Sequence, residues 1–415
     1  MNKDFVVGIV GAGIGGVTLA RTLWKNGIPF QLFDQAPEFG EVGAGIQITP
    51  NAVKVLHDLG LKKELKKDYF LPESMVGKNW DDGKVLFRTQ IKNTFDRLFG
   101  APYYQMHRAD LHEALVKDLP EECVNFNSIC LGVEESKGKS KIIFDDGSEF
   151  EADLVVGADG IRSNVRESIW GKDDPTFTGH MCWRALVPVE EFPLSFVHPG
   201  LTIWFGPHGH VVTYYVRNGR EVNIVAVKET ENWEKESWTV SSSTDELVGA
   251  FEKWHPDVVK LLRLTDNNKV FKWGLFDRQP MEQWSSKNTT LLGDAAHPML
   301  PYLSQGAAMA TEDGYILAEA LSHFNCDISS SLQAYEKERV ERTRNVQLAS
   351  RERGVTYHLD SEEKQKERNR KMKQREKENK NAVGINSEWV YEYDPIQCHT
   401  RFSNFEWINS NRATH

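Results

Sequence analysis

The chain has 415 residues and a formal net charge of −10, with 40% hydrophobic and 27% charged residues. This length allows two or three domains, or one large α/β domain with an insertion, and the acidic balance argues against a nucleic-acid partner bound through a basic surface. No apolar run approaches the roughly 18 residues of a membrane span, and no secretory signal pattern opens the sequence, so we expect a cytoplasmic enzyme that acts on small molecules as a monomer or homodimer.

Residues 5–34 predict a strand, a helix and a second strand. Gly11, Gly13 and Gly16, with Gly15 in the same loop, form a G-x-G-x-x-G pattern between the first strand and the helix. Such a loop turns tightly, lets the backbone approach a pyrophosphate and packs helix on strand, and Asp34 at the end of the second strand can accept a hydrogen bond from a ribose hydroxyl. These features predict a dinucleotide site, with a purely structural glycine turn as the alternative, and they do not distinguish NAD from FAD.

The middle of the chain is rich in predicted strands. Residues 141–160 predict a hairpin around Asp146-Gly147 and then an apolar strand that ends near Asp159. Three β-rich runs between residues 202 and 229 predict an antiparallel meander inserted between α/β pieces. We therefore divide the chain into a first nucleotide-binding part (1–175), a substrate-binding sheet (176–275), a last nucleotide-binding part (276–355) and a charged helical tail (356–415).

The last nucleotide-binding part starts with the strand TTLLGD, passes a loop with Pro301 and enters a long helix near Gly306. Free N–H groups at Gln305, Gly306 and Ala307 would stabilise negative charge on a ligand, and the same residues would cap the helix in any case. Residues 361–380 are charged or amide-bearing without an apolar stripe, which predicts a solvated helix or a disordered segment, with an interaction tail as the minority interpretation. The aromatic run SEWVYEYDP indicates that the chain then docks back onto the body.

Cysteine usage and ligand spacing give no sign of a metal. The five cysteines are scattered, without a CxxC pair, and no histidine, cysteine or aspartate cluster has metal-ligand spacing. We expect free thiols and no metal site.

Three further motifs, HRADLHEAL, DLVVGADGIRSNVRESI and TTLLGDAAHPMLPYLSQGAAMATEDG, resemble those of the single-component FAD-dependent aromatic hydroxylase family, and the resemblance covers residues 4 to about 350. It implies an α/β protein with a Rossmann-like FAD-binding domain of the glutathione-reductase type and an inserted antiparallel substrate sheet. It also implies FAD as cofactor and NADH or NADPH as co-substrate, with a slight preference for NADH. By this resemblance Arg108 lies along the FAD, Asp159 joins the cofactor and nicotinamide regions, and Asp294 binds the ribityl chain. The helix start near Gly306 would then face the negatively charged reduced flavin.

The run from His210 to Val216 is the predicted substrate face. Alternation places His210, Val212 and Tyr214 on one side of a strand, and we expect His210 and Tyr214 roughly 7 Å apart, in contact with one aromatic ring. Electrophilic oxygen attacks an electron-rich ring, so a phenol substrate benefits from losing its proton, and a histidine with a near-neutral pKa is a suitable acceptor. The alternative is that His210 is a turn residue and that Tyr214 only packs in the sheet.

Within the family, the sequence looks most similar to hydroxylases of small hydroxylated aromatic acids, of the salicylate 1-hydroxylase, 6-hydroxynicotinate 3-monooxygenase and 4-hydroxybenzoate 1-hydroxylase type. That similarity adds Gln47 and Tyr302 to the substrate pocket. The hydroxynicotinate enzymes have histidines at both positions, which disfavours a pyridine and favours a benzenoid acid such as salicylate or 4-hydroxybenzoate.

The predicted function is therefore a monooxygenase that consumes O2 and NAD(P)H and hydroxylates such an acid with oxidative decarboxylation. The alternatives are hydroxylation of a pyridine or larger phenolic compound without loss of CO2, and a flavin-binding protein without hydroxylase activity.

Overall fold

The computed structural model describes residues 5–40, 44–136, 138–193, 196–231, 240–378 and 386–404. A parallel sheet of five strands in the order β18-β11-β1-β2-β7 forms the first layer. Its strands are β1 (Val7–Val10), β2 (Phe30–Phe33), β7 (Val124–Asn125), β11 (Leu154–Gly157) and β18 (Thr289–Leu291). This arrangement confirms the predicted Rossmann-like α/β fold.

Two helices from opposite ends of the sequence pack together against this layer. Helix α1 (Ile14–Lys25) follows the glycine loop directly, and α9 (Gly306–His323) lies against it. Gly314 permits the contact, because a Cβ at this position would lie 2.7 Å from the backbone oxygen of Gly15. The predicted strand, helix and second strand at residues 5–34 and the predicted long helix near Gly306 are confirmed.

A buried ionic group joins α9 to the long helix α10 (Ile328–Tyr357). Arg339 of α10 is fully buried and pairs with Glu312 and Asp313 of α9, with 2.7 Å between Arg339 Nε and Asp313 Oδ1. Asp313 also accepts hydrogen bonds from His297 Nε2 at 2.5 Å and from the backbone N–H of Gly293 at 2.9 Å. The ionic group therefore holds the GDAAH loop in place.

Smaller elements complete the first layer. The predicted hairpin around Asp146-Gly147 is confirmed as β9 (Lys139–Phe144) and β10 (Glu149–Ala152), which with β8 (Cys130–Ser136) form a three-stranded antiparallel sheet. The other elements near this layer are β3 (Gly45–Ile48), β6 (Tyr104–His107), α2 (Pro50–Asp58), α3 (Lys62–Leu65), α5 (Arg108–Val116) and α6 (Asn164–Trp170).

An eight-stranded sheet, in the order β16-β17-β12-β15-β14-β13-β4-β5, forms the second layer. The predicted meander is confirmed as β13 (Leu201–Gly206), β14 (Gly209–Val216) and β15 (Glu221–Glu229). Beside it lie β12 (Thr176–Pro188), β16 (Val240–Ser241) and β17 (Phe271–Asp277). The sheet extends beyond the predicted segment 176–275, because β4 (Ser74–Asn79) pairs parallel to β13 and β5 (Val85–Gln90) continues the edge.

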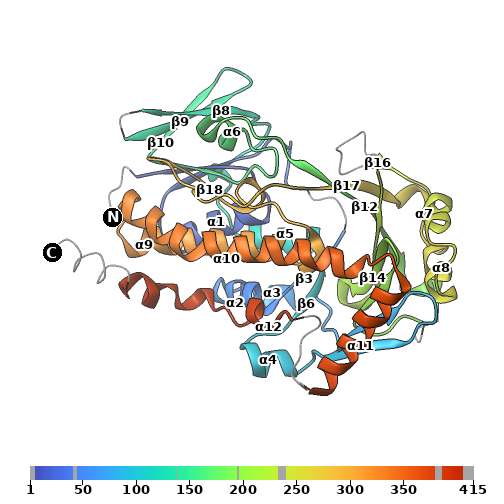
Figure 1. Cartoon of the computed structure of the whole chain (residues 1–415). Helices are drawn as coiled ribbons and strands as arrows, with labels where there is room; N and C mark the ends of the chain where they lie inside the picture. Colours follow the sequence, from blue (N-terminus) through green and yellow to red (C-terminus); the bar gives the residue numbers. More distant parts are fainter. Residues whose placement is uncertain are drawn as a thin grey trace.

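The two faces of the second sheet have different roles (Figure 1). Helices α7 (Thr244–Ala250) and α8 (Pro256–Leu262) cover one face with an apolar core that includes Trp183 and Tyr215. The opposite face carries Cys182, Tyr214 and Val225 and packs on α4 (Thr94–Phe99), α12 (Glu388–Tyr391) and the C-terminal end of α10. The second face is the one that meets the nucleotide-binding layer.

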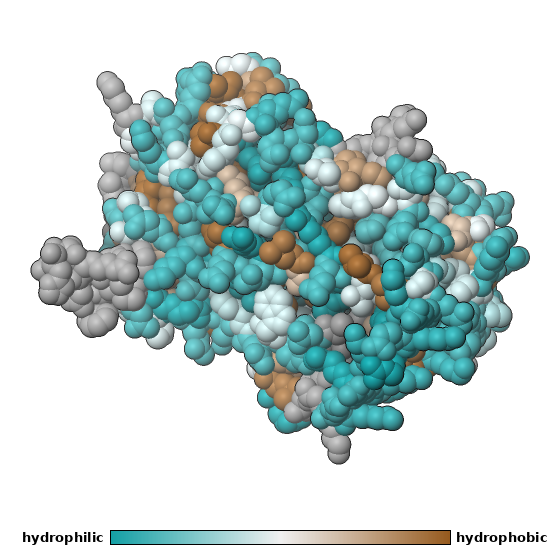
Figure 2. Space-filling model, in the orientation of Figure 1, coloured by the Kyte–Doolittle hydropathy of each residue, from teal (hydrophilic) through white to brown (hydrophobic). Residues whose placement is uncertain are grey.

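The charged segment forms α11 (Glu362–Glu378), which lies beside β5 (Figure 1). Its outer face is solvated as predicted, and Figure 2 shows the corresponding side of the molecule to be mainly hydrophilic. Its inner face differs from the prediction, because Gln365, Arg368 and Met372 are buried and Met372 joins the core of the second sheet. The docking of the following aromatic run is confirmed by buried Val390 and Tyr391.

Two further observations concern the whole described chain. All five cysteines, each within the described ranges, are free thiols. Among the helices of those ranges, none combines the length and the apolarity that crossing a bilayer requires.

Candidate active site

A cavity of about 1310 Å³ lies between the parallel sheet and the second sheet. A pocket for a single small ligand usually measures roughly 300–1,000 Å³, so this one has room for a dinucleotide together with a small substrate. Most of the residues predicted for cofactor and substrate line it: Gly13, Asp34, Gln47, Arg108, Asp159, His210, Tyr214, Asp294, Pro301, Tyr302, Gln305, Gly306 and Ala307.

The other three glycines of the fingerprint do not line the cavity but shape its wall. Gly11 has φ +104°, and a Cβ there would lie 2.4 Å from the carbonyl oxygen of Ala158. A Cβ at Gly16 would lie 2.0 Å from the carbonyl oxygen of Gly11, and one at Gly15 would lie 2.6 Å from Leu292 Cδ1. Only glycine fits at Gly11 and Gly16, where the close atoms belong to the backbone, whereas at Gly15 the Leu292 side chain would have to move. The close packing aims the N-terminus of α1 at the cavity.

Two carboxylates face the same part of the cavity. Asp34 accepts hydrogen bonds from the backbone N–H groups of Ala12 at 2.6 Å and Ala36 at 2.8 Å, which fixes the carboxylate and leaves lone pairs for a ligand hydroxyl. In the described part of the chain, Asp159 Oδ1 is buried without a hydrogen-bond partner. Burial raises the pKa of Asp159, against the hydrogen bonds from the Ser163 hydroxyl and the Val165 N–H. A buried acceptor without a partner, beside a helix N-terminus, is the arrangement expected where a nucleotide supplies the missing donor.

After the glycine loop and the two carboxylates, the start of α9 forms the third wall of the cavity. The turn Gly293–Ala295 and Pro301 precede it in the chain. The Gln305 side chain does not point at the ligand, since its Nε2 donates to Thr49 Oγ1 at 3.0 Å and its Oε1 accepts from Asn51 at 3.1 Å. It instead fixes the helix start, so that Gly306 and Ala307 line the cavity with their backbone. Burial raises the pKa of Asp294, while electrostatic interactions with His297 and Arg108 oppose that rise.

Strand β14 carries the predicted substrate residues. His210 and Tyr214 both point into the cavity, which confirms the predicted alternation, while Val211 and Tyr215 face the core under α7 and α8. The predicted separation of roughly 7 Å was wrong. The two residues are four apart along a strand of regular register, and four steps of about 3.3 Å place their Cα atoms about 13 Å apart.

The expected near-neutral titration of His210 is also wrong for the ligand-free cavity. Burial, with the nearby His180 ring as a second cause, lowers the pKa of His210 to about 3. The neutral ring packs edge-on against Tyr302 and Tyr357, and its Nδ1 lies 2.8 Å from Nε2 of His358. His210 is therefore a neutral hydrogen-bonding group here, and a negative charge placed beside it would raise its pKa.

Gln47 and Tyr214 form one polar group of the pocket. The Tyr103 hydroxyl donates to Gln47 Oε1. Burial raises the pKa of Tyr214 to about 12, against the charge of Arg184 and a hydrogen bond with Gln47. Tyr214 is therefore a neutral phenol that can donate a hydrogen bond to a ligand. Tyr302, on the other side of His210, has its hydroxyl 2.8 Å from His180 Nδ1.

Sequence reasoning missed Arg184, a cationic residue that lines this pocket beside Trp273. Arg184 Nη1 donates to the carbonyl oxygen of Gly45 at 3.0 Å, and the guanidinium lies 5.1 Å from the ring centre of Trp273. Within the ranges described, its buried Nε has no hydrogen-bond partner. Alternation along β12 would have placed Arg184 on the side of Cys182, opposite Trp183, but no signal in the sequence marked that side as the pocket.

Comparison with known proteins agrees with this architecture. A protein family described as an FAD binding domain matches residues 4–350. A 3-amino-4-hydroxybenzoate 2-monooxygenase of Streptomyces platensis is 40% identical over 353 residues, which cover 85% of this chain and 88% of that protein. A 3-hydroxybenzoate 6-hydroxylase of Polaromonas naphthalenivorans (strain CJ2) is 35% identical over 399 residues, covering 95% of this chain and 98% of that protein. A solved substrate complex of salicylate hydroxylase is 26% identical and superposes with a TM-score of 0.82, over 97% of this chain and 98% of that structure.

Proposed function

This chain belongs to the FAD-binding domain family and is a flavoprotein aromatic monooxygenase, and from that premise we propose that its substrate is a small benzenoid acid bearing a ring hydroxyl. When bound, FAD accepts hydride from NAD(P)H and activates O2 for transfer of one oxygen atom to the substrate. The protein supplies binding, orientation and a closed, water-poor pocket.

The residues proposed to hold FAD follow from the three walls of the cavity. Gly13 and the N-terminus of α1 would face the pyrophosphate, and Asp34 would accept a ribose hydroxyl. Asp159 and Asp294 would accept hydrogen bonds from ligand hydroxyls, since one has a buried oxygen that lacks a donor in the described structure and the other lines the cavity.

Arg108 and the start of α9 complete the proposed FAD site. The charge of Arg108 lies close enough to Asp294 to oppose the rise in the pKa of that carboxyl. Pro301 lies before Gln305, whose side chain fixes the helix start, and Gly306 and Ala307 would offer N–H groups to the negative charge of the reduced ring.

The observation that carries the substrate class is Arg184. A guanidinium that lines the cavity and lies over the ring of Trp273 matches a planar carboxylate on an aromatic ring. The 3-amino-4-hydroxybenzoate and 3-hydroxybenzoate in the names of two relatives each combine a carboxylate with a ring hydroxyl.

His210 is proposed to act on the ring hydroxyl and Tyr214 on another polar group of the substrate, since their Cα atoms lie about 13 Å apart along β14. Tyr214 keeps its proton over the whole working pH range and would donate a hydrogen bond. Neutral His210 would hydrogen-bond to the ring oxygen through Nε2, because its Nδ1 already contacts His358, and a phenolate placed there would raise the pKa of the imidazole. Gln47 and Tyr302 would fix the two ends of the ring.

The fate of the carboxylate separates two forms of the reaction. Oxidative decarboxylation of salicylate or 4-hydroxybenzoate stays a prediction. Oxygen insertion at a ring carbon that keeps the carboxylate is favoured by the names of the two relatives, which number a ring position of a benzoate as the site of oxidation.

The experiment measures NADH and NADPH oxidation by the FAD-loaded protein under air, with salicylate, 3- and 4-hydroxybenzoate, 3-amino-4-hydroxybenzoate and 6-hydroxynicotinate. CO2, H2O2 and the aromatic product are quantified together. We expect one benzenoid acid to accelerate oxidation with a matching amount of hydroxylated product, and its CO2 yield decides between the two forms. Failure of every acid, or recovery of all reducing equivalents as H2O2, would overturn the proposed substrate class and leave a larger phenol or a passive flavin-binding protein.

A further inference from the structure

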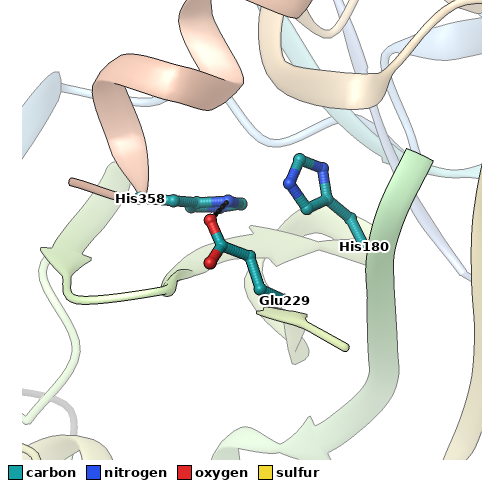
Figure 3. Close-up of side chains that lie close together, drawn as sticks. All are labelled: His180, Glu229 and His358. Atoms are coloured by element: carbon teal, nitrogen blue, oxygen red, sulfur yellow. Dashed lines mark ion pairs between the residues drawn. The ribbon is translucent and has the colours of Figure 1, made fainter. Parts of the chain in front are cut away.

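Behind the substrate pocket lies a second polar cluster, formed by His180, Glu229 and His358 (Figure 3). None of the three lines the cavity of the candidate active site. His180 of β12 and Glu229 of β15 are directly opposed across neighbouring antiparallel strands, and His358 caps the C-terminal end of α10. One potential ligand atom from each residue lies within 4.8 Å of the others.

Each of the three side chains has its second polar atom fixed by a neighbour. His180 Nδ1 lies 2.8 Å from the Tyr302 hydroxyl, and His358 Nε2 lies 2.8 Å from His210 Nδ1. The second carboxylate oxygen of Glu229 lies 2.6 Å from Nδ1 of His208. Such outer contacts orient metal-binding imidazoles and carboxylates in proteins.

The remaining polar atom of each of the three side chains faces the other two. His358 Nδ1 is buried, finds no hydrogen-bond partner within the described structure, and lies 3.7 Å from Glu229 Oε1. Figure 3 shows the free nitrogen of His180 directed toward the same carboxylate. A buried imidazole nitrogen without a hydrogen-bond partner is destabilising, and a bound ion would supply the missing partner.

We propose that His180 Nε2, His358 Nδ1 and Glu229 Oε1 bind a divalent cation of the zinc type, with water as the fourth ligand. Two imidazoles and one carboxylate are an established ligand set for Zn²⁺, and bonds of about 2.0–2.1 Å in tetrahedral geometry need ligand atoms about 3.4 Å apart. The nitrogen and oxygen of His358 and Glu229 are already near that spacing.

The position of the site indicates a structural and positioning role. Its ligands join β12, β15 and the end of α10, from which α11 continues. It is one hydrogen bond away from Tyr302 and His210, which line the cavity. With a metal on Nδ1, His358 Nε2 carries a proton and donates to His210 Nδ1, which leaves the His210 proton on Nε2. Glu229 and His208 have side chains exposed by 38% and 53%, which gives an ion access from solvent.

The test uses untagged, FAD-loaded protein treated with EDTA and titrated with ZnCl2 by calorimetry. We expect one Zn²⁺ per wild-type chain, and a rise in melting temperature upon addition of Zn²⁺. Glu229→Gln keeps the size of the side chain and should weaken binding by more than the roughly 10–100-fold expected for His208→Gln, which removes only an outer contact. His399→Gln is the matched control, since it alters a histidine that lies 2.5 Å from Glu319, away from the cluster.

Cobalt gives an independent signature, because Co²⁺ bound by this ligand set absorbs visible light beyond the flavin bands. Absence of stoichiometric Zn²⁺ binding in the wild-type protein, or equal binding by wild type and Glu229→Gln, would overturn the proposal. If Glu229→Gln does not retain FAD, the Zn²⁺ affinity of His208→Gln is compared with that of the wild type instead, and equal affinities would overturn the proposal. The His208 side chain is largely exposed, so its replacement leaves the core intact.

Discussion

Replacing Arg184 by methionine removes the only charge that we assign to the substrate carboxylate and keeps an unbranched side chain that can still lie against Trp273. In the wild-type protein the Arg184 guanidinium lines the cavity, with Nη1 bonded to the carbonyl oxygen of Gly45 and the ring centre of Trp273 5.1 Å away. Met at this position therefore leaves a bound carboxylate without a charged partner.

The expected size of the effect follows from the loss of one hydrogen bond to a charged group. A hydrogen bond to a charged group contributes about 1.5–3 kcal/mol, which corresponds to a roughly 10- to 150-fold rise in KM for the acid. Because the carboxylate is bound equally before and during oxygen transfer, kcat should stay within about twofold.

Steady-state NADH oxidation, coupled to product analysis, measures both constants for the preferred hydroxybenzoate and for the corresponding hydroxybenzamide. Arg184→Met should raise KM for the acid and leave KM for the neutral amide nearly unchanged. Arg217→Met is the control, since Arg217 lines the same cavity but is paired with Glu221 at 3.2 Å and Asp110 at 3.7 Å. An unchanged KM for the acid, or an equal rise for the amide, would refute the assignment of Arg184 to the carboxylate.

Three further changes test the architecture. Gly16→Val should abolish FAD binding, measured by flavin fluorescence, because even a Cβ would lie 2.0 Å from the Gly11 oxygen; Gly249→Ala, where no described atom lies within 4 Å of the new Cβ, should bind FAD normally. Arg339→Met removes one cation from a buried group in which Glu312 keeps Arg342 and Asp313 keeps His297, and should lower the free energy of unfolding by no more than about 3–5 kcal/mol. In the wild-type protein Arg342 and Arg339 hold the pKa of Glu312 below its unfolded value, and His297 and Arg339 do the same for Asp313, in both cases against burial. This stabilisation is present above about pH 4 and lost as pH falls further, and urea unfolding should show a smaller loss of stability over that range in the variant. Met372→Ala removes the main apolar contact of α11 and should open the helix locally, seen as faster tryptic cleavage than in the exposed Gln374→Ala control, which keeps every tryptic site; equal cleavage rates would show that Met372 does not hold the helix.

Local patterns in the sequence predicted those parts of the fold whose partners are near in the chain. The glycine loop, the hairpin at Asp146-Gly147 and the meander of β13 to β15 each combine neighbouring segments, and periodicity and turn residues suffice to describe them. The sequence did not predict that β4 and β5 belong to the second sheet, because nothing local indicates that residues 74–90 pair with a strand more than a hundred positions later.

The same distinction applies to the candidate site: residues in local motifs were predicted to lie in it, and Arg184 was not. Asp34, Asp159 and Asp294 occur in motifs and were found, although only the folded chain shows that the Gln305 side chain turns away from the ligand. Arg184 lies in an ordinary strand, and its role depends on which face of β12 is covered by the helices. The burial of Met372 was not predicted, because one apolar residue among lysines and glutamates gives no periodic hydrophobic pattern.

The interleaving of the two sheets affects how the protein is made. The second sheet needs β4 and β5 from near residue 80 as well as β17, which ends at Asp277, and the parallel sheet is complete only when β18 pairs with β11. A ribosome-bound chain therefore holds two unfinished sheets with open edges until about two-thirds of the protein has emerged, and such edges recruit other strands. Neither sheet is a separable module, so fusing the flavin layer of this protein to the substrate layer of a relative requires exchanging at least two stretches of sequence together.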